Sequence, residues 1–184
     1  MTIVMFTIFL LPPNFVAAER LVDFEKVIDL DKPTLQKHFK NFKTLSQLFP
    51  ENIKNIQNVK DTTNGQILKM DLNINGFSLN PQVLFKESQG KYIFKILDSD
   101  LKGTRITTAL EETWGFDGTP NQGTRVNVKT SFHSSGFFSL INLVPDEAII
   151  FALDYGFFNI VENTKNPGKI IEEKKNQSNK KGHR

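Results

Sequence analysis

The sequence contains no cysteine and only 3 histidines among 184 residues. Without cysteine the chain has no disulfide framework and no thiolate to act as a nucleophile or metal ligand. The histidines, His38, His133 and His183, are scattered along the chain, whereas a zinc site needs three or four converging ligands. We therefore expect no metal site and no cofactor.

Aromatic side chains with a polar group are also scarce, with 1 Trp and 2 Tyr against 17 Phe. A surplus of phenyl rings suits an apolar interior, which is either roomy or simply well filled. The apolar fraction of 39% and the charged fraction of 23% are ordinary for a globular protein. The length is that of a single domain with a real core.

The body of the chain has no net positive charge, although the net charge of the whole chain is +3. Residues 165–184 hold seven Lys or Arg and two Glu, a net of +5, which leaves −2 for the rest. The basic character therefore belongs to a tail, predicted over 169–184 to be disordered. A slightly acidic body has no electrostatic footprint for a phosphate backbone, so nucleic-acid binding is not expected.

No apolar run is long enough to cross a bilayer, which takes roughly 20 residues. The run from Ile3 to Leu11 is followed by Val16-Ala17-Ala18, small residues just before Glu19. This pattern predicts a secretory signal peptide over 1–18, and hence a secreted or cell-envelope protein. No Lys or Arg precedes the run, so an uncleaved apolar arm, with a cytoplasmic or membrane-peripheral location, stays as the alternative.

The N-terminal part of the body predicts a strand followed by helix. Residues 21–30 alternate well enough for a strand, after which Asp31 and Pro33 suit the start of a helix. Apolar residues then follow at spacings of four and three up to Pro50, which predicts one helix or two short helices in sequence. These residues are Leu35, Phe39, Phe42, Leu45 and Phe49.

From Ile53 to Ser134 the apolar period is two, which predicts a series of antiparallel strands joined by short turns. One face of this sheet should carry the inward rows of residues 68–74, 77–85, 92–96, 106–116 and 126–132. Pro145-Asp146-Glu147 then opens a helix that Asn166-Pro167-Gly168 ends. Apolar residues surround more than half of this helix, so we expect most of its surface to be buried. The predicted fold class is α+β.

This order of elements resembles the START-like (SRPBCC) superfamily, in particular its coenzyme Q-binding and polyketide cyclase-like branch. The local cues are Val27 to Pro33 before the first helix, Leu48-Phe49-Pro50 after it, and Gly123 to Val126 at the last strand. The resemblance covers residues 21 to 165, within a domain predicted over 19–168. It implies the helix-grip fold, a twisted antiparallel sheet wrapped around a long C-terminal helix. It also implies a cavity between them for a lipid, quinone, sterol or polyketide-like molecule.

The predicted ligand site combines inward sheet residues with one face of the last helix, although each residue could equally be ordinary core. Phe151, Tyr155 and Phe158 are spaced by four and three, so they share a helical face that should point at the sheet. Tyr155 is the expected orienting hydroxyl. The predicted ligand-binding residues are Met70, Phe77, Phe94, Thr108, Glu112, Trp114, Thr130, Phe132, Phe151, Tyr155 and Phe158.

Glu112 is the polar residue that separates the functional hypotheses. It is in phase with Ile106 and Leu110, and a buried carboxylate without a partner is costly. The leading hypothesis is non-catalytic binding or transport of a hydrophobic small molecule. The alternatives are a cyclase or dehydratase that uses Glu112 with a threonine hydroxyl, and an interaction module with a filled interior. A purely structural interpretation is a β-bulge that turns Glu112 outward beside Glu111, or a salt bridge at the mouth of the sheet.

The connection before the last helix is unusually apolar for a loop. It either tucks under the sheet or contacts a membrane surface weakly, with help from the basic tail. The residues predicted to make that contact are Phe137, Phe138, Leu140 and Ile141.

Overall fold

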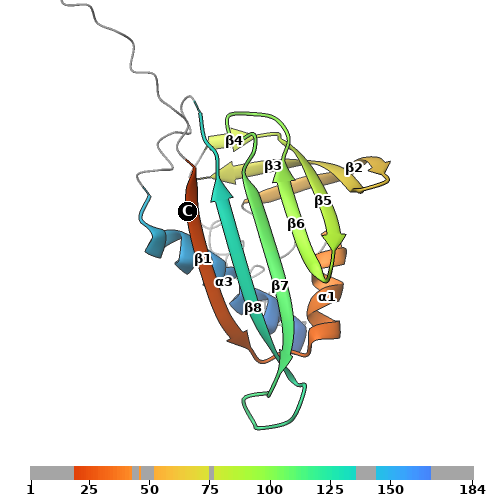
Figure 1. Ribbon diagram of the computed structural model, residues 1–184, viewed down its shortest axis with the longest axis vertical. Helices are drawn as coiled ribbons and strands as arrows, with labels where there is room; N and C mark the ends of the chain where they lie inside the picture. The colour runs from red at the N-terminus through yellow and green to blue at the C-terminus, as the bar shows by residue number, and fades with distance from the viewer. Residues whose placement is uncertain (1–18, 43–45, 47–51, 75–76, 136–143, 167–184) are drawn as a thin grey trace, which may run out of the picture.

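A computed structural model describes residues 19–42, 46, 52–74, 77–135 and 144–166, without the side chains of Ile74 and Phe77. In this part of the chain, eight strands form one antiparallel sheet that curves around helices α1 and α3 (Figure 1). The elements are β1 (Arg20–Ile28), α1 (Lys32–Lys40), β2 (Ile53–Thr62), β3 (Gly65–Ile74), β4 (Phe77–Leu79), β5 (Gln82–Ser88), β6 (Lys91–Ile96), β7 (Arg105–Thr113), β8 (Gly123–Phe132) and α3 (Asp146–Lys165). The predicted helix-grip arrangement is confirmed.

The strands follow the order β1-β8-β7-β6-β5-β3-β2, and β4 pairs with β3 beside β5. From β5 to β8 each strand pairs with the next one along the chain, as expected for strands joined by short turns. The first strand joins the last, since β1 pairs with β8 along its whole length. This pairing sets the N-terminal strand beside the strand that precedes α3.

Helix α1 begins as the sequence predicts. The carboxylate of Asp31 accepts the backbone N–H of Thr34 at 2.9 Å, and Pro33 lies in the first turn. The helix ends at Lys40, where Asn41 has an extended backbone, and Phe42 and Ser46 are helical again. The break at Asn41 favours two short helices over one.

Proline explains a break in the sheet between β4 and β5. The period of two predicts a continuous inward row over residues 77–85, with an edge or bulge at Pro81. The structure instead ends β4 at Leu79 and begins β5 at Gln82. Because proline has no N–H to donate to a ladder, the strand stops there and restarts one residue later. Val83 and Phe85 still face inward and are buried.

Helix α3 has the predicted boundaries but not the predicted burial. Its buried residues are Gly156, Phe157 and Ile160. Phe151, Tyr155 and Phe158 are 72%, 56% and 54% exposed, so the expectation of a helix buried over most of its surface is wrong. None of the described helices is long and apolar enough to cross a membrane.

Candidate ligand site on the inner face of the sheet

The strand register assembles two neighbouring rows of side chains on the inner face of the sheet. We call them the Phe94 row and the Tyr92 row. The Phe94 row runs through Phe85, Phe94, Ile106, Thr130 and Val22. The Tyr92 row runs through Tyr92, Thr108, Val128 and Phe24. Directly opposed side chains in such rows lie about 5 Å apart, so each row is a continuous surface.

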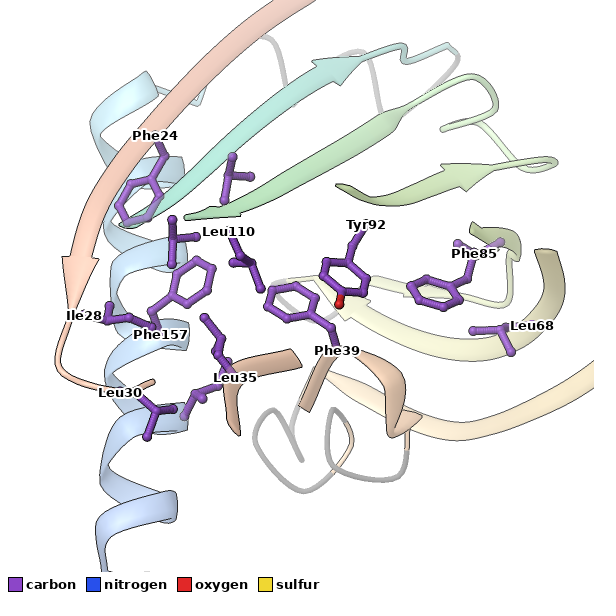
Figure 2. Close-up of a cluster of buried hydrophobic side chains, with 14 of the residues drawn as sticks. Phe24, Ile28, Leu30, Leu35, Phe39, Leu68, Phe85, Tyr92, Leu110 and Phe157 are labelled. Atoms are coloured by element: carbon purple, nitrogen blue, oxygen red, sulfur yellow. The ribbon is translucent and has the colours of Figure 1, made fainter. Parts of the chain in front are cut away.

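A series of rings from the helices covers the Tyr92 row. Phe157 of α3 stacks on Phe24 at 5.8 Å between ring centroids, and Phe39 of α1 stacks on Tyr92 at 5.0 Å. Phe39 and Phe157 are 6.4 Å apart. Figure 2 shows these rings between the helices and the sheet. This side of the interior is closed.

The middle of the Phe94 row is covered less completely. Phe94 and Ile106 are only partly buried, as is Ile96, which lies on the same face of β6. Phe94 packs against Phe85 with ring centroids 4.9 Å apart. We call Phe94, Ile96 and Ile106 the open side of the interior. It is an apolar surface next to the closed side.

Three residues of the two rows carry a hydroxyl group. Thr108 and Thr130 are buried, and Tyr92 is 0% exposed. Among the buried side-chain nitrogens and oxygens of the described residues, only the Tyr92 hydroxyl lacks a hydrogen-bond partner. A buried polar group left unpaired costs about 1–3 kcal/mol. The site therefore holds one hydroxyl with no partner at hydrogen-bond distance among the described residues, on a ring that packs against phenyl rings and lies near the polar side chains of Gln36, Lys40 and Glu87.

The surroundings of Tyr92 keep this hydroxyl protonated. Burial raises the pKa of Tyr92 above its ordinary value, and the Glu87 carboxylate opposite it adds to the rise. Lys40, which pairs with Glu87 at 3.0 Å, and the nearby side chain of Gln36 oppose the rise in pKa without cancelling it. At neutral pH the group is a phenol that can both donate and accept a hydrogen bond.

The structure places five of the eight predicted sheet residues on this inner face. Met70, Thr108 and Thr130 are buried there, and Phe94 and Phe132 are partly buried. Phe77 begins β4, but its side chain lies outside the described part of the structure.

Two predicted sheet residues lie elsewhere. Glu112 is exposed, although its neighbour Thr124 on β8 is buried and donates its hydroxyl to the Leu30 carbonyl at 2.7 Å. The connection between β1 and α1 thus covers Thr124, whereas Glu112 opposite it stays exposed. Trp114 is 63% exposed because β7 ends at Thr113, and the alternation of side chains ends with it.

The predicted face of α3 also points away from the sheet. Ion pairs from Asp154 to Lys26 of β1 and from Lys165 to Asp29, which follows β1, lie along one side of the helix. With the helix in this orientation Phe157 and Ile160 enter the core, and Phe151, Tyr155 and Phe158 face solvent. The placement predicted for these three aromatic residues, including Tyr155 as an inward hydroxyl, is therefore wrong.

The predicted ligand site omitted three residues of the interior: Phe39, Tyr92 and Phe157. Tyr92 had a usable signal, because it is in phase with Phe94 and Ile96 and is one of only 2 tyrosines. Phe157 had none, since α3 is apolar on two faces.

The remaining sequence-based predictions concern metal ligands and three segments of the chain. No group of three or more His, Asp or Glu side chains gathers there in a way that suits a metal ion. The predicted signal peptide (1–18), the predicted membrane contact (Phe137, Phe138, Leu140 and Ile141) and the basic tail (169–184) lie outside the described residues.

No protein-family model and no curated protein matches the sequence. Solved structures do match the fold. The chain is similar to the Zhui aromatase/cyclase of Streptomyces sp. R1128, with a TM-score of 0.62 at 8% identity over 82% of this chain and 99% of that one. It is similar to a START superfamily protein of Mycobacterium smegmatis, with a TM-score of 0.61 at 12% identity, over 79% and 97% of the two chains.

A third similar structure holds small molecules. It is norcoclaurine synthase from Thalictrum flavum in complex with dopamine and hydroxybenzaldehyde, with a TM-score of 0.53 at 14% identity over 79% of this chain and 88% of that one. The fold is thus shared by proteins named as enzymes and by one named only for its superfamily. The resemblance expected from the order of elements is confirmed at the level of the fold: this chain has the helix-grip fold of the START-like (SRPBCC) superfamily.

Proposed function

We propose that the chain binds a mostly apolar small molecule on the inner face of the sheet, without catalysing a reaction on it. The observation that carries this proposal is the Tyr92 hydroxyl, which is fully buried and has no partner among the described residues. One hydrogen bond from a bound molecule would remove that cost. The ligand we infer is therefore largely hydrocarbon or aromatic, with a single group that can pair with a phenol.

The open side of the interior supports the apolar part of this proposal. Phe94, Ile96 and Ile106 present partly exposed apolar surface beside Tyr92 and Thr108. Ligand sites typically combine such a surface with a few polar groups. The norcoclaurine synthase complex shows that a protein of this fold can hold two small aromatic molecules. A lipid, quinone, sterol or polyketide-like ligand each meets the same chemical description.

A cyclase or dehydratase that uses Glu112 has weaker support. A general acid with a raised pKa needs a desolvated carboxyl group, and Glu112 is exposed at the end of β7. Tyr92 and the two threonines supply hydrogen bonds but no group that titrates near neutral pH. The described residues thus favour a carrier.

The test uses the only two tyrosines as a matched pair. Native mass spectrometry of protein gently extracted from its own cells identifies the bound molecule, and titration with it gives the Kd of each variant. Tyr92→Phe should weaken binding by about 1 kcal/mol, roughly fivefold in Kd. Tyr155→Phe makes the same chemical change at a position 56% exposed and should leave Kd unchanged.

Two results would count against the proposal. If Tyr92→Phe binds as tightly as the parent, its hydroxyl does not contact the ligand. If no apolar molecule accompanies or binds the parent chain, the interior is a filled core, as the third hypothesis states.

A further inference from the structure

Two large aromatic side chains project from the ordered loop between β7 and β8. Trp114 is 63% exposed and Phe116 is 70% exposed, on either side of the buried Gly115. The loop is held by its own hydrogen bonds: the Gly115 N–H donates to the Thr119 carbonyl at 2.8 Å, and the Thr119 N–H donates to the Asp117 carboxylate at 2.9 Å. The two rings are therefore held at the surface by a structured turn. Figure 1 shows the loop between β7 and β8 extending beyond the end of the sheet.

The end of α3 is connected to this loop through one aspartate. Asp29 Oδ1 accepts the Phe116 N–H at 3.2 Å, and Asp29 Oδ2 pairs with the Nζ of Lys165, the last residue of α3. Both contacts lower the pKa of Asp29, the one with Lys165 more strongly. The carboxylate thus stays charged at neutral pH. The chain leaves α3 next to Phe116.

The residues that follow α3 contain an apolar pair within reach of the loop. Ile170 and Ile171 are the only large apolar residues in 167–184. Ile170 comes five residues after Lys165, and five extended residues span up to about 17 Å. Lys165 contacts Asp29, and Asp29 contacts Phe116, so the end of α3 lies close to the two rings. Ile170 can therefore reach the rings without any movement of α3.

The distribution of charge also favours contact between residues 167–184 and this loop. Glu111, Glu112 and Asp117 are exposed at this end of the sheet. Residues 167–184 hold six Lys or Arg and two Glu, a net of +4. Lys169 directly precedes the isoleucine pair, and Lys174 and Lys175 follow it after Glu172 and Glu173. Docking of the pair therefore brings a segment of net positive charge to the exposed carboxylates. An anionic membrane surface would be repelled by the same carboxylates.

We propose that Ile170 and Ile171 dock on Trp114 and Phe116, so that residues 167–184 fold back onto the β7–β8 loop. This contact covers apolar surface that would otherwise face water. It also holds the basic segment against the acidic end of the sheet. The proposal does not depend on the ligand site, which lies on the inner face of the sheet.

Trp114 is the only tryptophan in the chain, so its fluorescence reports on this contact alone. In the full chain, docking should give emission at short wavelength and weak quenching by acrylamide. The double variant Ile170→Ser/Ile171→Ser should shift the emission to longer wavelength and strengthen quenching. The control Asn176→Ser/Gln177→Ser changes two residues of the same segment without removing apolar surface, and its emission should match the parent.

The proposal is overturned if the parent, the isoleucine variant and the control give the same emission and quenching. It is also overturned if the short-wavelength emission of the parent is lost on dilution, since a second copy of the chain would then cover Trp114. Agreement of the parent with the control at every protein concentration, with only the isoleucine variant shifted, supports it.

Discussion

The closed and open sides of the interior use similar side chains for different purposes. On the closed side, Phe24, Phe39, Tyr92 and Phe157 stack on one another and are buried. On the open side, Phe94, Ile96 and Ile106 occupy the same sheet face but stay partly exposed. The difference arises from what lies opposite: α1 and α3 supply rings to the Tyr92 row. The closed side stabilises the fold, and the open side leaves apolar surface that a ligand can use.

The largest expected effect is on the closed side. Phe157→Ala removes the ring that packs between Phe24 and Phe39, and we expect a loss of about 3–5 kcal/mol in the free energy of unfolding, measured by urea denaturation. Phe158→Ala is the matched control, because Phe158 is the next residue of the helix and its side chain is 54% exposed. It should cost less than about 1 kcal/mol. Similar losses for both variants would show that the helix packs through a different face.

A smaller loss of stability is expected on the open side. Phe94→Ala removes a partly buried ring and should cost about 2 kcal/mol. Binding of the molecule identified by mass spectrometry should fall more strongly than in Tyr92→Phe, because the ring supplies contact area. Unchanged binding by a folded Phe94→Ala protein would place the ligand away from the open side.

The contact between α1 and α3 should make stability depend on pH. His38 Nε2 lies 2.8 Å from Thr164 Oγ1, which donates its own proton to the Ile160 carbonyl at 2.7 Å, so the imidazole is the donor. Burial lowers the pKa of His38 from 6.5. The unfolded chain therefore binds a proton more readily, and stability should fall as the pH drops below about 6.5.

Thermal unfolding between pH 7.5 and 5 measures this slope. The variant His38→Gln should flatten this pH dependence, because it removes the imidazole that titrates. His133 and His183 are unchanged in the variant, so the difference is due to His38. Equal slopes for the parent and the variant would assign the pH dependence to other groups.

The smallest effect is expected on the outer face of α3. Phe151→Trp would obstruct a pocket if this side chain pointed at the sheet. It is 72% exposed, so the change should alter stability by no more than about 0.5 kcal/mol and leave ligand binding unaffected. A melt and a binding titration on one sample test both expectations, and reduced binding would restore Phe151 to the site.

The element order and much of the inner face follow from the sequence alone. Asp31 and Pro33 start α1, Pro145 precedes α3, and a period of two marks the strands. Alternation also assigns Met70, Thr108 and Thr130 to the inner face, because successive side chains of a strand point to opposite sides. These are local properties, set by the backbone and its nearest neighbours.

Tertiary contacts decided the rest. The alternation of the sequence extends through Glu112 and Trp114, but β7 ends at Thr113 and Glu112 is exposed at its end. Helix α3 is apolar on two faces, so its periodicity allowed two orientations. The packing of Phe157 against Phe24 and Phe39 fixes the one that exposes Tyr155, and the ion pairs of Asp154 with Lys26 and of Lys165 with Asp29 accompany it. Since this orientation of α3 exposes Tyr155, Tyr92 is the tyrosine whose hydroxyl is buried. Which of the two is buried depends on residues that are distant in the sequence and close in space.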